Sequence, residues 1–173
     1  GGGAVFRRDG SNGWTIVTSG TSVDLRGVWG ASANDVWIVG SGGTIRHWDG
    51  NTLTSVASGT TNDLRAVWGT SASDVWVVGR SGITLHWNGS TWITVPPSTA
   101  QDLRGVSGTS PTDVWAVGDS GEIIHWDGNA WSLQTSGTDY FFGGVWASSR
   151  DDVWVVGSGG TILHRGEFAT ANC

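Results

Sequence analysis

Short apolar runs, each ended by a glycine- or serine-rich turn, follow one another along the whole chain and favour β-strands. These runs recur with one period. The sequence DVW begins at residues 35, 74, 113 and 152, 39 residues apart each time, and a Val-Gly pair and a His follow at fixed distances. A repeat of this length with four strand-like runs in each copy is typical of β-propeller blades. The pattern predicts an all-β propeller of about four blades, each a four-stranded antiparallel sheet.

Each 39-residue unit contains four predicted strands, called A to D in chain order. Strand A is the LRGVWG-type run, strand B is the VWIVG-type run, and strand C is the TIRHW-type run. Strand C usually ends in Asp-Gly or Asn-Gly, which is a strong hairpin signal, and strand D follows. A further C-D pair precedes the first strand A. The chain therefore carries four strands of types A, B and D but five of type C.

The unequal count bears on how the propeller closes. Residues 1–173 are expected to form one domain of four units, 24–62, 63–101, 102–140 and 141–173, with residues 1–23 completing the last unit. In a four-bladed ring, the N-terminal strand D would pair with the last A-B-C sheet and leave no free edge. Alternatively, several copies of the chain would join as a homo-oligomer that completes a larger ring. The sequence leaves both arrangements open.

Composition agrees with strands and narrows the classes of partner. The chain has 29 Gly and 13 Trp, and its net charge is −6. This charge argues against a nucleic acid or an anionic membrane surface as partner, since either requires a basic patch. No apolar run has the length needed for membrane insertion. The single Cys173 leaves no internal disulfide and is expected to be a free thiol, and the absence of an initiating Met suggests a processed or excised form.

One His and one Asp recur in every unit, and both are expected to be structural. The histidines lie on strand C and the aspartates open strand B, at His47, His86, His125 and His164 and at Asp35, Asp74, Asp113 and Asp152. Equivalent positions on separate blades lie too far apart to share one metal ion. We expect the histidines to form hydrogen bonds within or between blades and the aspartates to accept backbone N–H bonds in the preceding turn. Without a nucleophile–base pair, metal cluster or phosphate loop, the chain is predicted to be no enzyme and to need no cofactor.

The DVW-x-VG…I-x-HWDG-x-x-W repeat resembles the Trp-rich bacterial β-propeller repeats and, more loosely, the tectonin-type lectin propellers. The resemblance covers almost the whole chain through its four DVW motifs. It implies a propeller fold but does not select a function, because propellers host lectins, scaffolds and enzymes alike. The first functional hypothesis is a secreted or cell-surface protein that binds glycans.

Repeated aromatic and cationic residues support the carbohydrate-binding hypothesis. Sugars stack on Trp faces, and the candidate platforms at the end of strand C and the start of strand D are Trp48, Trp87, Trp126, Trp14, Trp92 and Trp131. Three units also carry an Asp-x-Arg sequence, formed by Asp24 and Arg26, Asp63 and Arg65, and Asp102 and Arg104. The fourth unit loses both members together, which favours a structural Asp–Arg pair. A sugar or anion contact by these arginines is the alternative.

Variation among the units suggests a second function. The turn between strands B and C carries Ser41, Arg80, Asp119 or Ser158 at a position where the surrounding scaffold does not change. These turns are expected on the same face as the loops between strands D and A. Variable charge on one face suits a surface that binds a protein. The chain is therefore predicted to be a lectin-like propeller with shallow Trp-lined sites or, alternatively, a protein-interaction scaffold that uses this loop face.

Overall fold

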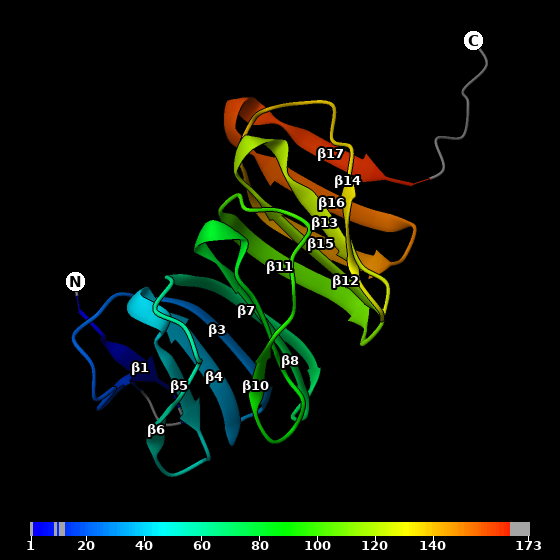
Figure 1. Cartoon of the computed structure of the whole chain (residues 1–173). Helices are drawn as coiled ribbons and strands as arrows, with labels where there is room; N and C mark the ends of the chain where they lie inside the picture. Colours follow the sequence, from blue (N-terminus) through cyan, green and yellow to red (C-terminus); the bar gives the residue numbers. More distant parts are fainter. Residues whose placement is uncertain (1, 9, 11–12, 167–173) are drawn as a thin grey trace.

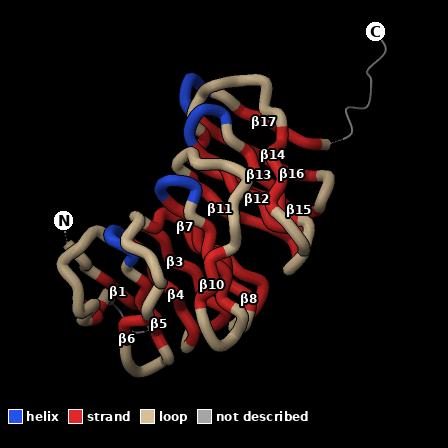
Figure 2. The backbone as a smooth tube through the Cα atoms, in the orientation of Figure 1, coloured by secondary structure: helices blue, strands red, loops and turns tan. Residues whose placement is uncertain are grey.

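Five antiparallel sheets make up the structure, a computed structural model of the chain that describes residues 2–8, 10 and 13–166. Figure 1 shows the sheets following one another as an arc. Strands and connecting turns account for the described residues, and Figure 2 shows that the few helical segments are single short turns at one end of the blades. The prediction of an all-β fold with four-stranded antiparallel sheets is confirmed.

Three sheets are complete blades with strands in the order A-B-C-D. Blade 1 consists of β3 (Leu25–Ser32), β4 (Asp35–Gly40), β5 (Ile45–Trp48) and β6 (Leu53–Val56). Blade 2 consists of β7 (Leu64–Ser71), β8 (Asp74–Gly79), β9 (Thr84–Trp87) and β10 (Trp92–Thr94). Blade 3 consists of β11 (Leu103–Ser110), β12 (Asp113–Gly118), β13 (Ile123–Trp126) and β14 (Trp131–Gln134).

The two ends of the arc carry incomplete sheets. Blade 4 has three described strands, β15 (Phe142–Ser149), β16 (Asp152–Gly157) and β17 (Ile162–Arg165), which correspond to A, B and C. The N-terminal hairpin, β1 (Val5–Arg7) and β2 (Thr15–Val17), corresponds to C and D. Among the described strands, β2 pairs with β1 alone. The described part of residues 1–23 therefore does not complete blade 4 within one chain, because the hairpin and blade 4 lie at opposite ends of the arc (Figure 1).

Apolar cores form where the faces of neighbouring blades pack against each other. The first core joins Trp37, Val39 and Ile45 of blade 1 to Leu64 and Val67 of blade 2. Equivalent residues form the cores between blades 2 and 3 and between blades 3 and 4. The inner strands pack in order, β3 on β7, β7 on β11 and β11 on β15. Burial on both faces explains the continuous VWIVG-type runs of strand B.

The repeated His and Asp tie strands together within each blade. Each His Nε2 lies 2.6–2.7 Å from an Asp oxygen, and the pairs are His47 with Asp35, His86 with Asp74, His125 with Asp113, and His164 with Asp152. Each imidazole also stacks on the Trp of strand B, with ring centroids 4.0–4.4 Å apart. The expected structural role of the histidines is confirmed.

The aspartates have a different role from the expected turn cap. A hydroxyl of strand A donates to the second oxygen of three of them, from Thr70 to Asp74, from Thr109 to Asp113 and from Ser148 to Asp152. In three of the A–B turns, a backbone N–H instead donates a hydrogen bond to a serine hydroxyl, that of Ser32, Ser71 or Ser110. The prediction of backbone capping by Asp is wrong, because the carboxylate points toward side-chain donors of the neighbouring strands.

Candidate functional site

The turns between strands B and C meet the loops between strands D and A on one face of the arc. The turns are the short helical segments η1 (Ser41–Gly43), η2 (Arg80–Gly82), η3 (Asp119–Gly121) and η4 (Ser158–Gly160). The first residue of each turn donates its backbone N–H, at 2.9 Å, to the carbonyl before strand A, and the pairs are Ser41 and Asp24, Arg80 and Asp63, Asp119 and Asp102, and Ser158 and Phe141. We call these turns and the loops 18–24, 57–63, 95–102 and 135–141 the loop face.

Arginines from the inner strands meet the variable turn residues at this face. Arg26 donates to Ser41 Oγ at 3.1 and 3.2 Å, and its Nη2 lies 3.7 Å from Asp24 Oδ2. Arg104 forms a two-pronged ion pair with Asp119, in which Nη2 lies 3.0 Å from Oδ2. Two sets of candidate residues that the sequence presented separately, the arginines and the variable turn residues, therefore form one site.

Aspartates at the start of strand A connect neighbouring blades. Asp102 of blade 3 accepts a hydrogen bond from Arg65 of blade 2 at 2.8 Å and another from the Ser81 backbone N–H at 2.8 Å. Arg80 Nε lies 3.7 Å from the same carboxylate. Asp63 accepts from the Gly42 backbone N–H of blade 1 in the same way. The predicted pair of Arg65 with the preceding Asp63 is thus replaced by a pair with the next unit's Asp, since adjacent inner strands bring the next blade closer.

The ion pair between Arg104 and Asp119 holds both of its members charged. The hydrogen bond from Arg104 is the largest influence on Asp119 and lowers the pKa of this carboxyl, and the same bond raises the pKa of Arg104. A cavity of about 500 Å³ lies beside these residues and is lined by Leu25, Arg26, Arg65, Arg104, Phe141 and Gly143. We call this cavity the inner channel, and its lining is charged and comes from all four inner strands or the loops next to them.

Blade 4 adds exposed aromatic side chains to the loop face. Tyr140 is 55% exposed and Phe141 is also exposed, where blades 2 and 3 carry Asn62 and Asp63 or Gln101 and Asp102. The guanidinium of Arg104 lies 5.1 Å from the centroid of the Phe141 ring. Sequence reasoning noted only that the fourth unit lacks the acid at the position of Phe141, and it missed Tyr140. The available signal was that the only Tyr of the chain falls at a position that carries Asn62 and Gln101 in the two preceding units.

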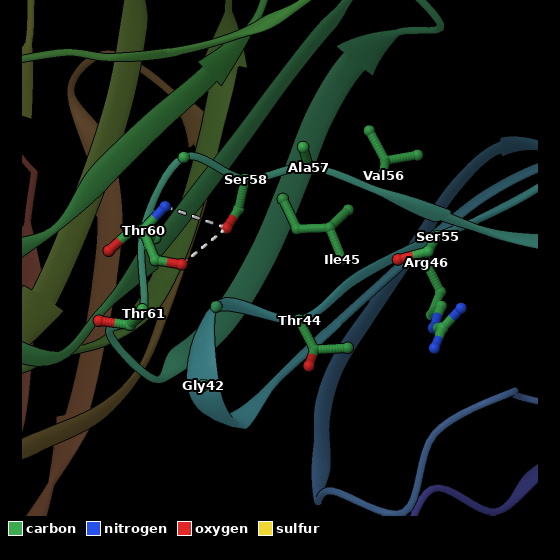
Figure 3. A pocket seen from close by; sticks show the side chains of 12 residues that line it. Gly42, Thr44, Ile45, Arg46, Ser55, Val56, Ala57, Ser58, Thr60 and Thr61 are labelled. Atoms are coloured by element: carbon green, nitrogen blue, oxygen red, sulfur yellow. Dashed lines mark hydrogen bonds between the residues drawn. The ribbon is translucent and has the colours of Figure 1, made fainter.

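A second hollow on the loop face lies at blade 1 (Figure 3). It measures about 730 Å³ and runs along η1, the start of β5 and the loop that follows β6. Ser58 Oγ donates to the Thr60 carbonyl at 3.1 Å and accepts from the Thr60 backbone N–H at 3.3 Å. Because the Ser58 hydroxyl is used to shape the loop, the polar side chains left to line the groove include Thr44, Thr61 and Arg46.

The predicted Trp platforms are mostly part of the packing between blades. Trp92 and Trp131 are buried, and each lies edge-on to the strand-B Trp of the preceding blade, 5.2 Å from Trp37 and 5.3 Å from Trp76. Trp87 and Trp126 are partly buried against the same two rings. Only Trp48, covered by Arg7 at 5.1 Å, and the exposed Trp14 lie at the N-terminal end of the arc.

Few of these positions leave an indole face free for a sugar. The carbohydrate-binding hypothesis stays a prediction. Of the variable turn residues, Ser41, Arg80 and Asp119 join the network described above, whereas Ser158 has Gly143 in place of an arginine on its inner strand.

The described residues contain neither a metal-binding cluster nor a helix that could span a membrane. No three His, Cys, Asp or Glu side chains in this part of the chain are grouped so that they could hold a metal ion. No helix among the same residues is both long and apolar enough to cross a membrane.

Comparisons with known proteins bear on the fold. No family model matches the sequence, and no curated protein matches it. Among solved structures, YCF48 bound to D1 peptide is similar over 98% of this chain and 60% of its own, with a TM-score of 0.72 and 17% identity. YCF48 from Cyanidioschyzon merolae is similar over 95% of this chain and 64% of its own, with a TM-score of 0.71 and 15% identity.

A third similar structure is the WD40 β-propeller domain of Doa1, with a TM-score of 0.69 and 12% identity over 94% of this chain and 60% of that one. The chain thus spans less than two thirds of the length of these structures. At such identities the likeness concerns the fold alone. Its sheets, their order and these neighbours together identify the chain as an arc of blades with the β-propeller fold.

Proposed function

We propose that the chain is a non-catalytic protein-interaction propeller and that its loop face binds a polypeptide. The observation that carries this proposal is the exposed Tyr140–Phe141 pair beside Arg104 and the row of Arg–Asp pairs. Tyr, Phe and Arg are enriched in the cores of protein interfaces, where a few such residues supply most of the binding energy. The similar propeller YCF48, one structure of which is bound to a D1 peptide, supports a polypeptide as the class of partner.

The loop face suits a partner with both apolar and polar groups. Phe141 offers an apolar surface that Arg104 partly covers, while Arg80, the most exposed arginine of the network at 57%, reaches out from η2. The ion pairs of Arg104 and Arg65 fix their guanidinium groups in place before a partner arrives. A partner would therefore bind by an aromatic or aliphatic side chain against Tyr140 and Phe141, with its polar groups directed at the rim of the channel.

A peptide-display selection on the folded chain tests this proposal. Peptides enriched from a random library would be synthesised and measured by fluorescence anisotropy against the wild type and Phe141→Asp. The variant restores the residue that Asp63 and Asp102 provide in the other units, so the fold should be kept. We expect it to weaken binding about 30-fold, the loss of one interface hot spot.

Asn129→Ala is the matched control because Asn129 is exposed in the turn after β13, at the opposite end of the blade from the loop face. It should leave the affinity unchanged. A selection that yields no binding peptide, or peptides that bind Phe141→Asp as tightly as the wild type, would refute the proposal. Selective binding on a glycan array would favour the lectin hypothesis instead.

A further inference from the structure

The C-terminal end of the arc exposes a face that is buried between all other blades. Ile162 of β17 is 64% exposed, whereas its equivalent Ile45 in blade 1 is 1% exposed. Trp154 and Val156 of β16 are exposed as well, although the equivalent Trp and Val of blades 1 to 3 are buried, namely Trp37 and Val39, Trp76 and Val78, and Trp115 and Val117. Blade 4 therefore presents one half of an interblade core, and no described residue packs against that half.

The N-terminal end exposes the other half of the same core. Val28 of β3 is 68% exposed, while its equivalent Val67 is 8% exposed and packs against Trp37, Val39 and Ile45 of the preceding blade. The contact between one blade and the next is thus repeated three times inside the chain, and its two halves are left open at the two ends. The two end faces are complementary because each of them is already matched within the chain.

Blade 4 has no outer strand among the described residues, and a groove lies where that strand would fit. The groove measures about 480 Å³ and runs beside the free edge of β17, between Trp115, Ile123 and Gln134 of blade 3 and Ile162 and His164 of blade 4. In blades 2 and 3 the outer strand begins with a Trp that packs on the strand-B Trp of the preceding blade. In the fourth unit Thr170 stands at this position, so the sequence supplies no Trp for Trp115.

The turn η4 likewise lacks the neighbouring loop that the other three turns contact. A Cβ on Gly43, Gly82 or Gly121 would lie 1.8–2.2 Å from a carbonyl oxygen of the next loop between strands D and A. A Cβ on the equivalent Gly160 would meet nothing within 4 Å. Within the described part of the chain, blade 4 therefore lacks both a strand D and the loop that follows it.

The N-terminal segment has the features of the missing piece. Trp14 occupies the position of Trp92 and Trp131 at the start of strand D, but it is 70% exposed. Ser19 and Thr21, which follow β2, form the same hydrogen bonds as the Ser-x-Thr of the other loops, at 3.1 and 3.3 Å. This loop has the shape of the one that is absent beside η4.

We propose that two copies of this chain join head to tail, with β2 of each copy pairing with β17 of the other. The second copy would cover Trp154, Val156 and Ile162 with its own β3 face, and its Trp14 would fill the groove against Trp115. Because each chain offers both halves of the contact, two copies close into a ring with two identical composite blades and no free end. The proposal does not depend on what the loop face binds.

In this assembly β1 is the strand that must move aside, because β1 and the partner copy's strand C occupy equivalent positions. β17 is held in blade 4 by the 2.7 Å bond between His164 and Asp152 and by the stack of His164 on Trp154. β1 carries Arg7 where β17 carries this His, so it lacks the imidazole that bonds Asp152 within the blade and stacks on Trp154. A chain lacking residues 1–8 should therefore still assemble.

The mass of the purified chain in solution is the first test. Sedimentation velocity at micromolar concentrations should give twice the 18.1 kDa of one chain. Trp14→Ala should raise the dissociation constant of the dimer at least tenfold, because a buried interface Trp is lost. Ile16→Ala is the matched control, since Ile16 lies on β2, two residues after Trp14, and is also exposed, but its equivalents Ser55, Thr94 and Leu133 are exposed in complete blades.

A second pair of variants tests the other half of the contact. Ile162→Glu places a charge on a side chain that is exposed in the single chain and buried in the proposed dimer, so it should give folded monomers. Leu133→Glu, at an exposed position outside the contact, should leave the dimer intact. A wild type with the mass of a single chain at every concentration would overturn the proposal. A dimer that survives both Trp14→Ala and Ile162→Glu would overturn it as well.

Discussion

At the scale of single residues, the turn between strands B and C depends on a glycine for two reasons. Gly82 adopts φ +70°, and a Cβ at this position would lie 2.2 Å from the Thr99 carbonyl oxygen of the neighbouring loop. The preceding residue in the same turn, Ser81, tolerates φ 56° because its side chain is exposed to solvent. The close approach rather than the dihedral angle alone decides which residue must be glycine.

Gly82→Ala is therefore expected to reduce the free energy of unfolding by about 3 kcal/mol or more, since backbone strain and steric overlap act together. Gly59→Ala is the matched control, because Gly59 has φ +75° but a Cβ added there would meet nothing within 4 Å. That variant should lose only about 1 kcal/mol. Urea unfolding monitored by Trp fluorescence measures both. Equal losses for the two variants would show that close approach is unimportant.

At the scale of elements, one carboxylate holds three strands of a blade together. Asp113 of β12 accepts from Thr109 of β11 and from His125 of β13, and Trp115 Nε1 donates to it at 3.2 Å. Burial raises the pKa of this carboxyl, but the hydrogen bonds from Thr109 and His125 outweigh burial and hold the pKa below its ordinary value of 3.8. Asp74 and Asp152 also have lowered pKa values, because each accepts hydrogen bonds from the equivalent hydroxyl and His of its own blade.

A carboxyl with a lowered pKa in the folded state stabilises the fold above the pKa it has when unfolded. This stability is lost as the pH falls through the lower, folded value. We expect the unfolding free energy to decline below about pH 4. Asp113→Asn should be less stable by about 1–2 kcal/mol at pH 7 and should show a shallower acid decline. Thermal unfolding at several pH values measures both, with the exposed Asp151→Asn as control. Parallel declines for wild type and Asp113→Asn would contradict the explanation.

The elements themselves were largely predictable, and the contacts between them were not. The 39-residue period, the four strand types and the Asn-Gly and Asp-Gly hairpins follow from local residue chemistry, and the structure confirms them. The pairing of Arg65 with Asp102 depends on how closely two inner strands of different blades approach, which a repeat pattern does not specify. The hydrogen bond that the Thr109 hydroxyl donates to Asp113 was also missed, since the turn sequence is equally compatible with an Asp that caps the backbone.

At the scale of the whole molecule, each blade contacts only its neighbours, so stability should vary along the arc. Blades 2 and 3 are covered on both faces, whereas blade 4 and the N-terminal hairpin have one neighbour each. Repeat arrays of this kind open from their ends, because terminal units make fewer contacts.

In a single-chain variant such as Ile162→Glu, amide hydrogens of β15–β17 should exchange about tenfold or more faster than those of β7–β9. Hydrogen–deuterium exchange with mass spectrometry measures the difference, and wild-type protein in the dimeric form is the control. In that form the end strands should be protected. Uniform exchange along the single chain would mean that the arc unfolds as one cooperative unit.

The arginine at the end of β17 has a further consequence for solubility. The other units end this strand in Trp48, Trp87 or Trp126, but β17 ends in Arg165, whose guanidinium lies 5.1 Å from the ring of Trp115. Edge strands with unpaired backbone groups invite indiscriminate stacking into fibrils, and a charged side chain on the edge discourages it. A strand whose aromatic side chain packs on the Arg165 guanidinium can still pair with this edge. The substitution thus acts as a gatekeeper, keeping an exposed β-edge from aggregating.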